Sequence, residues 1–126
     1  MHPVPGDRKR SRSITILSAV VAIAFLGVGA AKLIGAELAV ETFRRFGFTM
    51  GFMHFIGAAE VAGAVGLFLP RLAPLAATGL VLVTGGAVVQ HAIYDPIVSA
   101  LPAASLLVLC AFLAWARRGE LGAGRP

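Results

Sequence analysis

Apolar residues occur in four long blocks, separated by short segments that contain polar residues, glycine or proline. The blocks run from Ile14 to about Ile34, from about Phe52 to Leu69, from Leu72 to about Gln90 and from Ile97 to Ala116. At about 1.5 Å per residue, a helix of such length spans a hydrocarbon core of about 30 Å. Apolar side chains fill whole blocks instead of one face, which is typical of helices surrounded by lipid. The pattern predicts an all-α membrane protein, a four-transmembrane-helix bundle.

The connection between the first and second blocks has a different pattern. Its charged residues recur at helical spacing, and they are Glu37, Glu41, Arg44 and Arg45. The opposite face is mostly apolar and comprises Leu38, Ala39, Thr42, Phe43 and Phe46. This predicts a short amphipathic helix between the first two spans, with Glu41 paired to Arg45. We expect it to lie flat on the outer membrane surface or to cap the bundle.

Composition supports a lipid environment and weakens other interpretations. Hydrophobic residues make up 58% of the chain and charged residues 13%, whereas soluble domains carry about 25% charged residues. The formal net charge is +5, but the basic residues cluster at block ends and form no stripe with interleaved aromatic residues. We therefore expect the lipid bilayer, and not nucleic acid, as the partner of this charge. The single cysteine, Cys110, allows no intramolecular disulfide or paired thiol motif.

The distribution of lysine and arginine predicts the orientation. Eight of the 11 basic residues fall on the side of the two chain ends, and the other side has Lys32, Arg44 and Arg45. By the positive-inside rule, both termini are cytoplasmic in a multi-pass protein of the cell (plasma) membrane. Residues 1–13 are then expected to be a disordered basic tail, 14–116 the four-helix domain and 117–126 a second cytoplasmic tail. The first block is longer than the apolar core of a cleaved signal peptide, so we interpret it as a span.

Glu60 is the residue most indicative of function. It lies near the middle of the second block, where a carboxylate is costly unless it is protonated or paired. Its helix face also carries Met53, Gly57, Ala64 and Leu67, so we expect this face to look inward. The functional hypothesis is a proton-accepting or ligand-orienting group, and the structural alternative is a hydrogen bond between helices.

Lys32 lies near the outer end of the first span and has two possible positions. Its long side chain can reach toward Glu60 to form a buried ion pair, or it can extend to the lipid headgroups. We favour the headgroups.

Two histidines lie near the outer ends of neighbouring spans, His54 on the second and His91 on the third. Together with Gln90 they can form a polar cluster that relays protons or contacts a quinone headgroup. The alternative is that both histidines touch water at the interface. Because no third ligand has suitable spacing, we predict no metal site.

Local motifs predict further details. Asp95 followed by Pro96 is typical of a helix N-cap, and Pro102 is expected to bend the fourth span. Cys110 is expected to pack as a small hydrophobe. Small residues spaced four apart predict close helix contacts, and the pairs are Gly27 with Ala31, Ala59 with Gly63, and Ala62 with Gly66.

Several short stretches together resemble the DoxX-like family of small bacterial membrane proteins. They are GAAKL at 29–33, HFIGAAE at 54–60 and LAATGL at 75–80, followed by His91. The resemblance covers roughly residues 14–116 and implies a four-helix membrane protein. It also implies that Lys32, Glu60 and His91 form a polar core. Some members are associated with quinone-linked thiosulfate oxidation or with membrane-tethered oxidative-stress complexes, although a lone Cys110 does not fit a thiol relay.

The leading functional hypothesis is a redox-associated accessory subunit without catalytic residues of its own. In it Glu60, Lys32 and His91, with His54 nearby, form a buried polar site that holds a proton or a lipophile such as a quinone, in a shallow pocket open toward the outer leaflet. One alternative is a small oligomeric proton-coupled transporter. Another is a membrane scaffold for a partner redox enzyme, without a ligand.

Overall fold

The computed structural model describes residues 5–121, with side chains described from residue 11 onward, and its regular elements are helices joined by short turns. The elements are α1 (Pro5–Leu33), α2 (Glu37–Arg45), α3 (Met50–Leu67), α4 (Ala73–Tyr94), η1 (Ile97–Ala100), α5 (Leu101–Ala116) and η2 (Arg118–Glu120). Four stretches are long and apolar enough to cross a membrane, and they are Ser11–Leu33, Met50–Leu67, Ala73–Tyr94 and Ile97–Ala116. The predicted four-helix membrane bundle with a short helix between its first two spans is confirmed.

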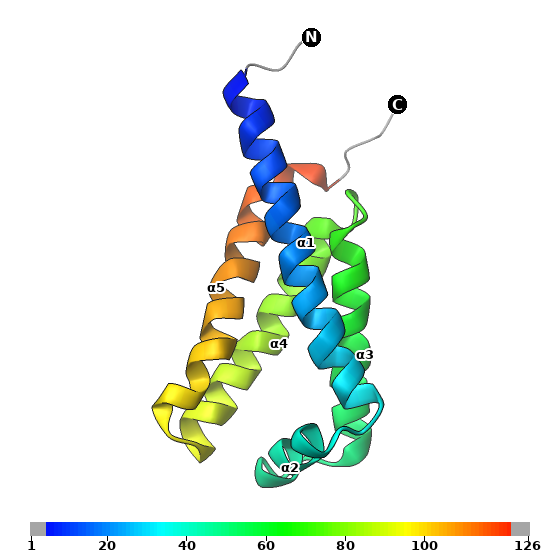
Figure 1. The fold of residues 1–126 in the computed structure, drawn as a ribbon, viewed down its shortest axis with the longest axis vertical. Helices are drawn as coiled ribbons and strands as arrows, with labels where there is room; N and C mark the ends of the chain where they lie inside the picture. Colours follow the sequence, from blue (N-terminus) through cyan, green and yellow to red (C-terminus); the bar gives the residue numbers. More distant parts are fainter. Residues whose placement is uncertain (1–4, 122–126) are drawn as a thin grey trace.

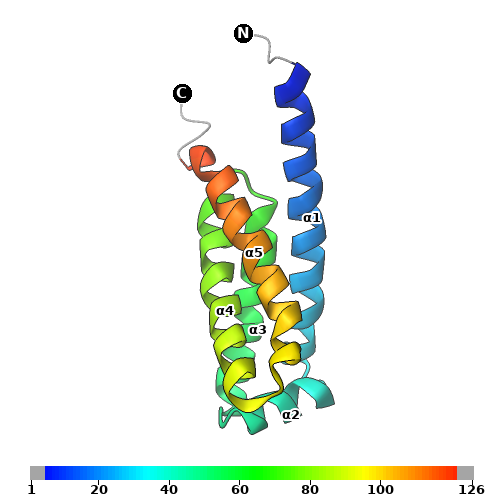
Figure 2. The ribbon, with the colours of Figure 1, turned by 90° about the vertical axis from the view of Figure 1, so that its left-hand side faces the viewer.

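The long helices run side by side, and each is antiparallel to the next along the chain (Figure 1). The start of α1, the turn between α3 and α4, and η2 lie at one end, which we call the terminal end. Helix α2 lies across the opposite end, which we call the α2 end. Helix α1 packs mainly against α3, and α4 packs against both α3 and α5. At the terminal end α1 extends past the other helices (Figure 2).

The hydrophobic core lies in the half of the bundle nearest the terminal end. A cluster of buried side chains joins all four long helices there, and it includes Val21, Phe25, Leu67, Leu80 and Leu113. Cys110 is fully buried in this cluster, as expected for a small hydrophobe. Many large apolar side chains point outward instead, which suits contact with lipid chains.

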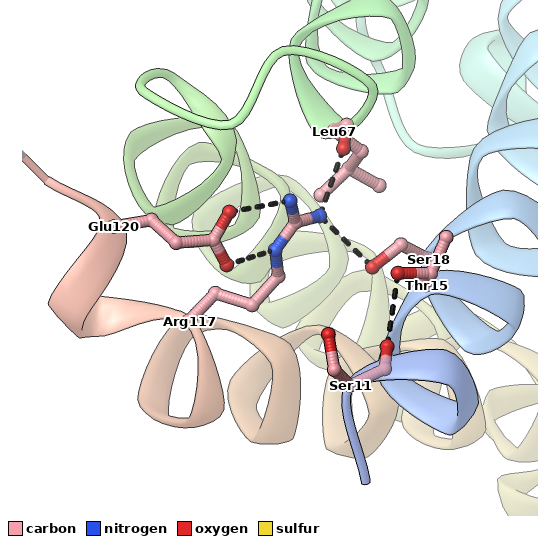
Figure 3. A network of polar contacts seen from close by, with 6 residues as sticks. All are labelled: Ser11, Thr15, Ser18, Leu67, Arg117 and Glu120. Atoms are coloured by element: carbon pink, nitrogen blue, oxygen red, sulfur yellow. Dashed lines mark hydrogen bonds and ion pairs between the residues drawn. The ribbon is translucent and has the colours of Figure 1, made fainter. Parts of the chain in front are cut away.

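A network of hydrogen bonds around Arg117 connects the helices at the terminal end (Figure 3). The Arg117 guanidinium donates to the Ser18 hydroxyl of α1 at 3.0 Å and to the Leu67 carbonyl of α3 at 2.8 Å. It also forms two hydrogen bonds, of 2.6 and 2.7 Å, with the Glu120 carboxylate. The cation thus satisfies a carbonyl at the C-terminal end of α3, where positive charge is favourable. The count of basic residues near the chain ends includes Arg117 but gives no indication of this contact.

Glycines bring the helix backbones into close approach at particular points. A Cβ atom placed on Gly29 would lie 2.9 Å from the Gly57 carbonyl oxygen, and one on Gly57 would lie 2.8 Å from that of Gly29. Gly63 is equally close to Leu80 of α4, as predicted for a helix contact, whereas Gly27 has open space around it. The crossing of α1 and α3 is therefore set by Gly29 and Gly57, and not by Gly27.

The first helix begins earlier than the sequence predicts. Residues 5–13, which we expected to be part of a disordered tail, continue α1 as a helix from Pro5. Proline is tolerated in the first turn of a helix, and the lysine and arginines that follow are good helix formers. Residues 1–4 of that expected tail, and 122–126 of the second, lie outside the described residues.

Two predictions about the fourth span are wrong. Asp95 does not cap its start, because its side chain binds groups on α2 and α4 and the following residues form the short helix η1. Pro102 does not interrupt a continuous helix but lies in the first turn of α5. In the first turn of a helix a backbone N–H has no partner within the helix, so the N–H that proline lacks costs nothing there. The 3₁₀-helix η1 ends at Ala100 and the α-helix α5 begins at Leu101.

The close approach of α1 and α3 can be tested with two alanine substitutions on the same helix. Gly29→Ala is expected to lower the free energy of unfolding by about 1–3 kcal/mol, because its methyl group would press on the α3 backbone. Gly27→Ala, in open space, is expected to be neutral or slightly stabilising. Unfolding followed by circular dichroism in mild detergent would measure both, and equal effects would contradict the assigned crossing.

Candidate functional site

A cavity of about 300 Å³ lies toward the α2 end, where α1, α2, α3 and α4 face one another. Its lining combines aromatic, small and polar residues, and α5 contributes none of them. The lining comprises Lys32, Thr42, Phe43, Phe46, Phe48, Phe52, Ile56, Glu60, Leu82, Val83, Gly86, Ala87, Gln90 and His91. The volume is at the small end of the range for ligand pockets, roughly 300–1,000 Å³.

An aromatic cluster forms the wall nearest α2. Phe43 of α2 lies within 6.0–6.4 Å, between ring centroids, of Phe46, Phe48 and Phe52. The ring of Phe46 also meets that of His91 edge-on at 5.1 Å. Phe43 and Phe46 are both buried, which places the apolar face of α2 against the bundle. The amphipathic helix thus caps the bundle, one of the two positions expected for it.

An ion pair between Lys32 and Glu60 forms part of the opposite wall. Lys32 Nζ lies 2.8 Å from Glu60 Oε1, and the two side chains are 17% and 6% exposed. Lys32 therefore reaches into the bundle, and the favoured interpretation of a lysine extended to the headgroups is wrong. The physical reason is the approach of Gly29 to Gly57, which brings the Lys32 Cβ against the α3 backbone.

This ion pair leaves the carboxylate only partly satisfied. Glu60 Oε1 is fully buried beside the Lys32 ammonium, and the described residues offer the carboxylate no donor besides Lys32. The nearby ammonium compensates its charge, while the ammonium itself also contacts the Val28 carbonyl at 3.4 Å. Burying a charge without complete hydrogen bonding is unfavourable. A hydrogen-bond donor that entered the cavity would reduce this cost.

His91 is held on the α4 side by a network that also includes α2. Its Nδ1 lies 2.7 Å from Asp95 Oδ2, and the Arg45 Nε lies 2.7 Å from Asp95 Oδ1. The Arg45 guanidinium and then the His91 ring, both bonded to Asp95, hold the pKa of that carboxyl below its usual value, against the opposing effect of desolvation. Arg45 therefore pairs with Asp95 and not with Glu41, because the end of α4 comes within its reach.

The directions of the helices aim these polar groups at one another. Side chains on a helix lean toward its N-terminus. The N-terminus of α3 is at the α2 end, so Glu60 leans that way, whereas His91 of α4 and Lys32 of α1 lean toward the terminal end. Gln90 lines the same cavity, but His54 is exposed and does not line it. The structure thus gathers Lys32, Glu60 and His91 and leaves out His54.

The cavity is open to the side of the bundle. Leu82, with 74% of its surface exposed, and Gly86, which is also exposed, both line the cavity and both belong to the membrane-spanning helix α4. A residue of this helix that is exposed in the single chain faces the hydrocarbon region. The site is therefore an aromatic pocket with charged and polar groups that borders an exposed face of a membrane-spanning helix. Among the described residues, no three acidic, histidine or cysteine side chains are grouped to hold a metal ion.

A double-mutant cycle would measure the coupling between Lys32 and Glu60. Lys32→Met and Glu60→Gln each remove one partner, and each is expected to lower the free energy of unfolding by about 3 kcal/mol because the other partner is left buried and unpaired. The double variant is expected to lose less than the sum, with a coupling of at least about 1 kcal/mol. Glu41→Gln, at an exposed position, is the matched control. Additive losses in a detergent-titration or steric-trapping assay would show that the pair does not form.

Comparison with known proteins gives one family. The sequence model described as the DoxX-like family matches residues 16–115, which include Lys32, Glu60, His91 and most of every candidate span. No curated protein and no solved structure matches the chain.

Proposed function

The chain belongs to the DoxX-like family, and we propose that it binds the ring headgroup of a quinone-type lipophile in the cavity between α1, α2, α3 and α4. In this proposal the protein is an accessory membrane subunit for redox metabolism. It holds the lipophile and supplies no catalytic residue of its own.

The observation that carries the proposal is the buried Glu60 carboxylate in the lining of a cavity that borders an exposed face of a membrane-spanning helix. Lys32 contacts one oxygen of this carboxylate, and the described residues offer the carboxylate no other donor. Intramembrane ionisable groups are costly and typically belong to functional sites. A ligand that reaches this carboxylate from the bilayer must be lipophilic and must carry a polar substituent.

The rest of the lining suits such a molecule. Phe43, Phe46 and Phe52 can stack against a flat ring, and offset or edge-to-face contacts between rings contribute about 0.5–1.5 kcal/mol each. Polar groups at two sides, the Lys32–Glu60 pair and His91, match a ring with oxygen substituents on opposite sides. The opening at Gly86 leaves a passage for an attached apolar tail.

The proposal includes an orientation. In the plasma membrane, the terminal end of the bundle faces the cytoplasm, because most of the basic residues belong to that end. The α2 end and the cavity then lie in the outer half of the bilayer. The other hypotheses from the sequence, an oligomeric proton-coupled transporter and a ligand-free scaffold, stay predictions. Proton-coupled flux in liposomes, or a partner captured by a protein that binds no lipophile, would favour one of them.

A leucine placed in the cavity tests the proposal. Gly86 lines the cavity on its exposed side and has open space around its Cβ position, so Gly86→Leu adds a bulky side chain at the edge of the pocket without pressing on a neighbouring helix. Gly79, on the same helix and equally unobstructed, does not line the cavity, so Gly79→Leu is the matched control. We expect Gly86→Leu to weaken binding of decyl benzoquinone or its quinol by at least about tenfold, which corresponds to 1.4 kcal/mol.

The measurement combines calorimetric titration with mass spectrometry of lipids retained by the purified protein. Wild type and Gly79→Leu should bind at least one redox form of the probe and retain a lipophile, and Gly86→Leu should lose both. Binding that is equal in all three proteins, or absent from wild type, would overturn the proposed function.

A further inference from the structure

Asp95 lies behind the cavity wall and contacts His91 from outside the pocket. It does not line the cavity, but its Oδ2 is 2.7 Å from His91 Nδ1 and its side chain is 9% exposed. A carboxylate can only accept hydrogen bonds, so the proton of this contact must be on Nδ1 of the ring. The network thereby selects one of the two imidazole tautomers.

Arg45 supplies the positive charge that balances Asp95 in this network. Its guanidinium contacts both oxygens of Asp95, with Nε at 2.7 Å from Oδ1 and Nη2 at 3.2 Å from Oδ2. Arginine is charged at every physiological pH, so it already neutralises the Asp95 carboxylate. A second cation on His91 is therefore not required to balance that charge. The neutral ring, with its proton on Nδ1, satisfies the contact.

Such a ring presents a lone pair on its other nitrogen. With Nδ1 bonded to Asp95, Nε2 is the nitrogen left to interact with an occupant of the cavity, which His91 lines. Phe46 meets the imidazole edge-on at 5.1 Å, and Arg45 lies 5.6 Å from the Phe46 ring centroid. These contacts restrict reorientation of the imidazole.

The opposite wall offers both a donor and an acceptor. Lys32 and Glu60 both line the cavity there, so either a hydroxyl group or a carbonyl oxygen of an occupant finds a partner in this ion pair. The difference between ligands therefore comes from His91, whose Nε2 favours a ligand with a hydroxyl group on that side, because a carbonyl oxygen facing its lone pair would be desolvated without a hydrogen bond.

We propose that Asp95, held by Arg45, is a positioning residue that fixes His91 Nε2 as a hydrogen-bond acceptor, and that the cavity therefore selects the hydroxyl-bearing, reduced form of a ring lipophile. The ligand part of this inference rests on the proposed function. The tautomer part concerns the protein alone and can be tested without a ligand.

Nitrogen-15 NMR of the histidine ring reads the tautomer directly. In protein with His2 and His54 replaced by glutamine, His91 is the sole histidine. Near neutral pH we expect an Nε2 signal of the unprotonated type and an Nδ1 signal of the protonated type. A protonated Nε2 in this protein, whether from the other tautomer or from the imidazolium, would overturn the inference.

Asp95→Asn then tests whether Asp95 is responsible. The amide is nearly isosteric but can donate as well as accept, so it no longer enforces a proton on Nδ1. We expect the population with a protonated Nε2 to increase. Glu120→Gln, the same chemical change in an ion pair at the terminal end, should leave the His91 signals unchanged. An unchanged tautomer in Asp95→Asn would also overturn the positioning role, and the wild-type spectrum decides the first part even if this variant does not fold.

The ligand part is tested with three matched probes under anaerobic conditions, decyl benzoquinol, its dimethyl ether and decyl benzoquinone. Wild type should bind the quinol at least about fivefold more tightly than either of the other two probes. This ratio corresponds to the net free energy of about one hydrogen bond. Asp95→Asn should reduce that preference, and Glu120→Gln should keep it. Equal binding of all three probes would overturn the inference and leave the proposed function standing, whereas no binding of any probe would overturn the proposed function itself.

Discussion

The arrangement of this bundle depends on how one carboxylate is accommodated inside a lipid-embedded protein. Glu60 can be buried because the Lys32 ammonium lies 2.8 Å from it, and Lys32 can reach it because Gly29 and Gly57 let α1 and α3 approach closely. A methyl group at either glycine would push the helices apart at the level of the ion pair. Backbone approach and charge compensation are thus parts of the same constraint, and the wall of the cavity follows from them.

The two halves of the molecule have different interiors. At the terminal end, apolar side chains from four helices fill the interior, and Arg117 links α1, α3 and the C-terminal segment. At the α2 end the interior is a cavity, and a short amphipathic helix covers it through Phe43, Phe46 and the Arg45–Asp95 pair. A rigid half can hold the spans in register while the other half leaves space for a molecule from the bilayer.

Much of the fold could be predicted from the sequence, because lipid imposes long apolar helices and leaves few alternatives. Glu60 and His91 were also recognisable, since polar residues inside such blocks need partners. The position of the Lys32 side chain could not be predicted. A flexible side chain near the end of a span can extend to the headgroups or turn into the bundle, and only the close approach of Gly29 and Gly57 decides between the two. The roles of Asp95, Arg45 and Arg117 depend on which helix ends meet, and local motifs contain no information about those distant contacts. The resemblance to DoxX-like proteins identified the family but not the wall that the aromatic residues form.

The most direct measurement is the distance between Lys32 and Glu60 in a bilayer. Solid-state NMR can detect dipolar coupling between ¹⁵N at the lysine Nζ and ¹³C at the glutamate carboxyl carbon, in protein in which Lys9→Arg leaves Lys32 as the sole lysine. We predict a strong coupling that corresponds to an ion-pair contact. The coupling should disappear in Glu60→Gln. No coupling at that range would show that the two groups are apart in lipid, and the account of the cavity wall would be contradicted.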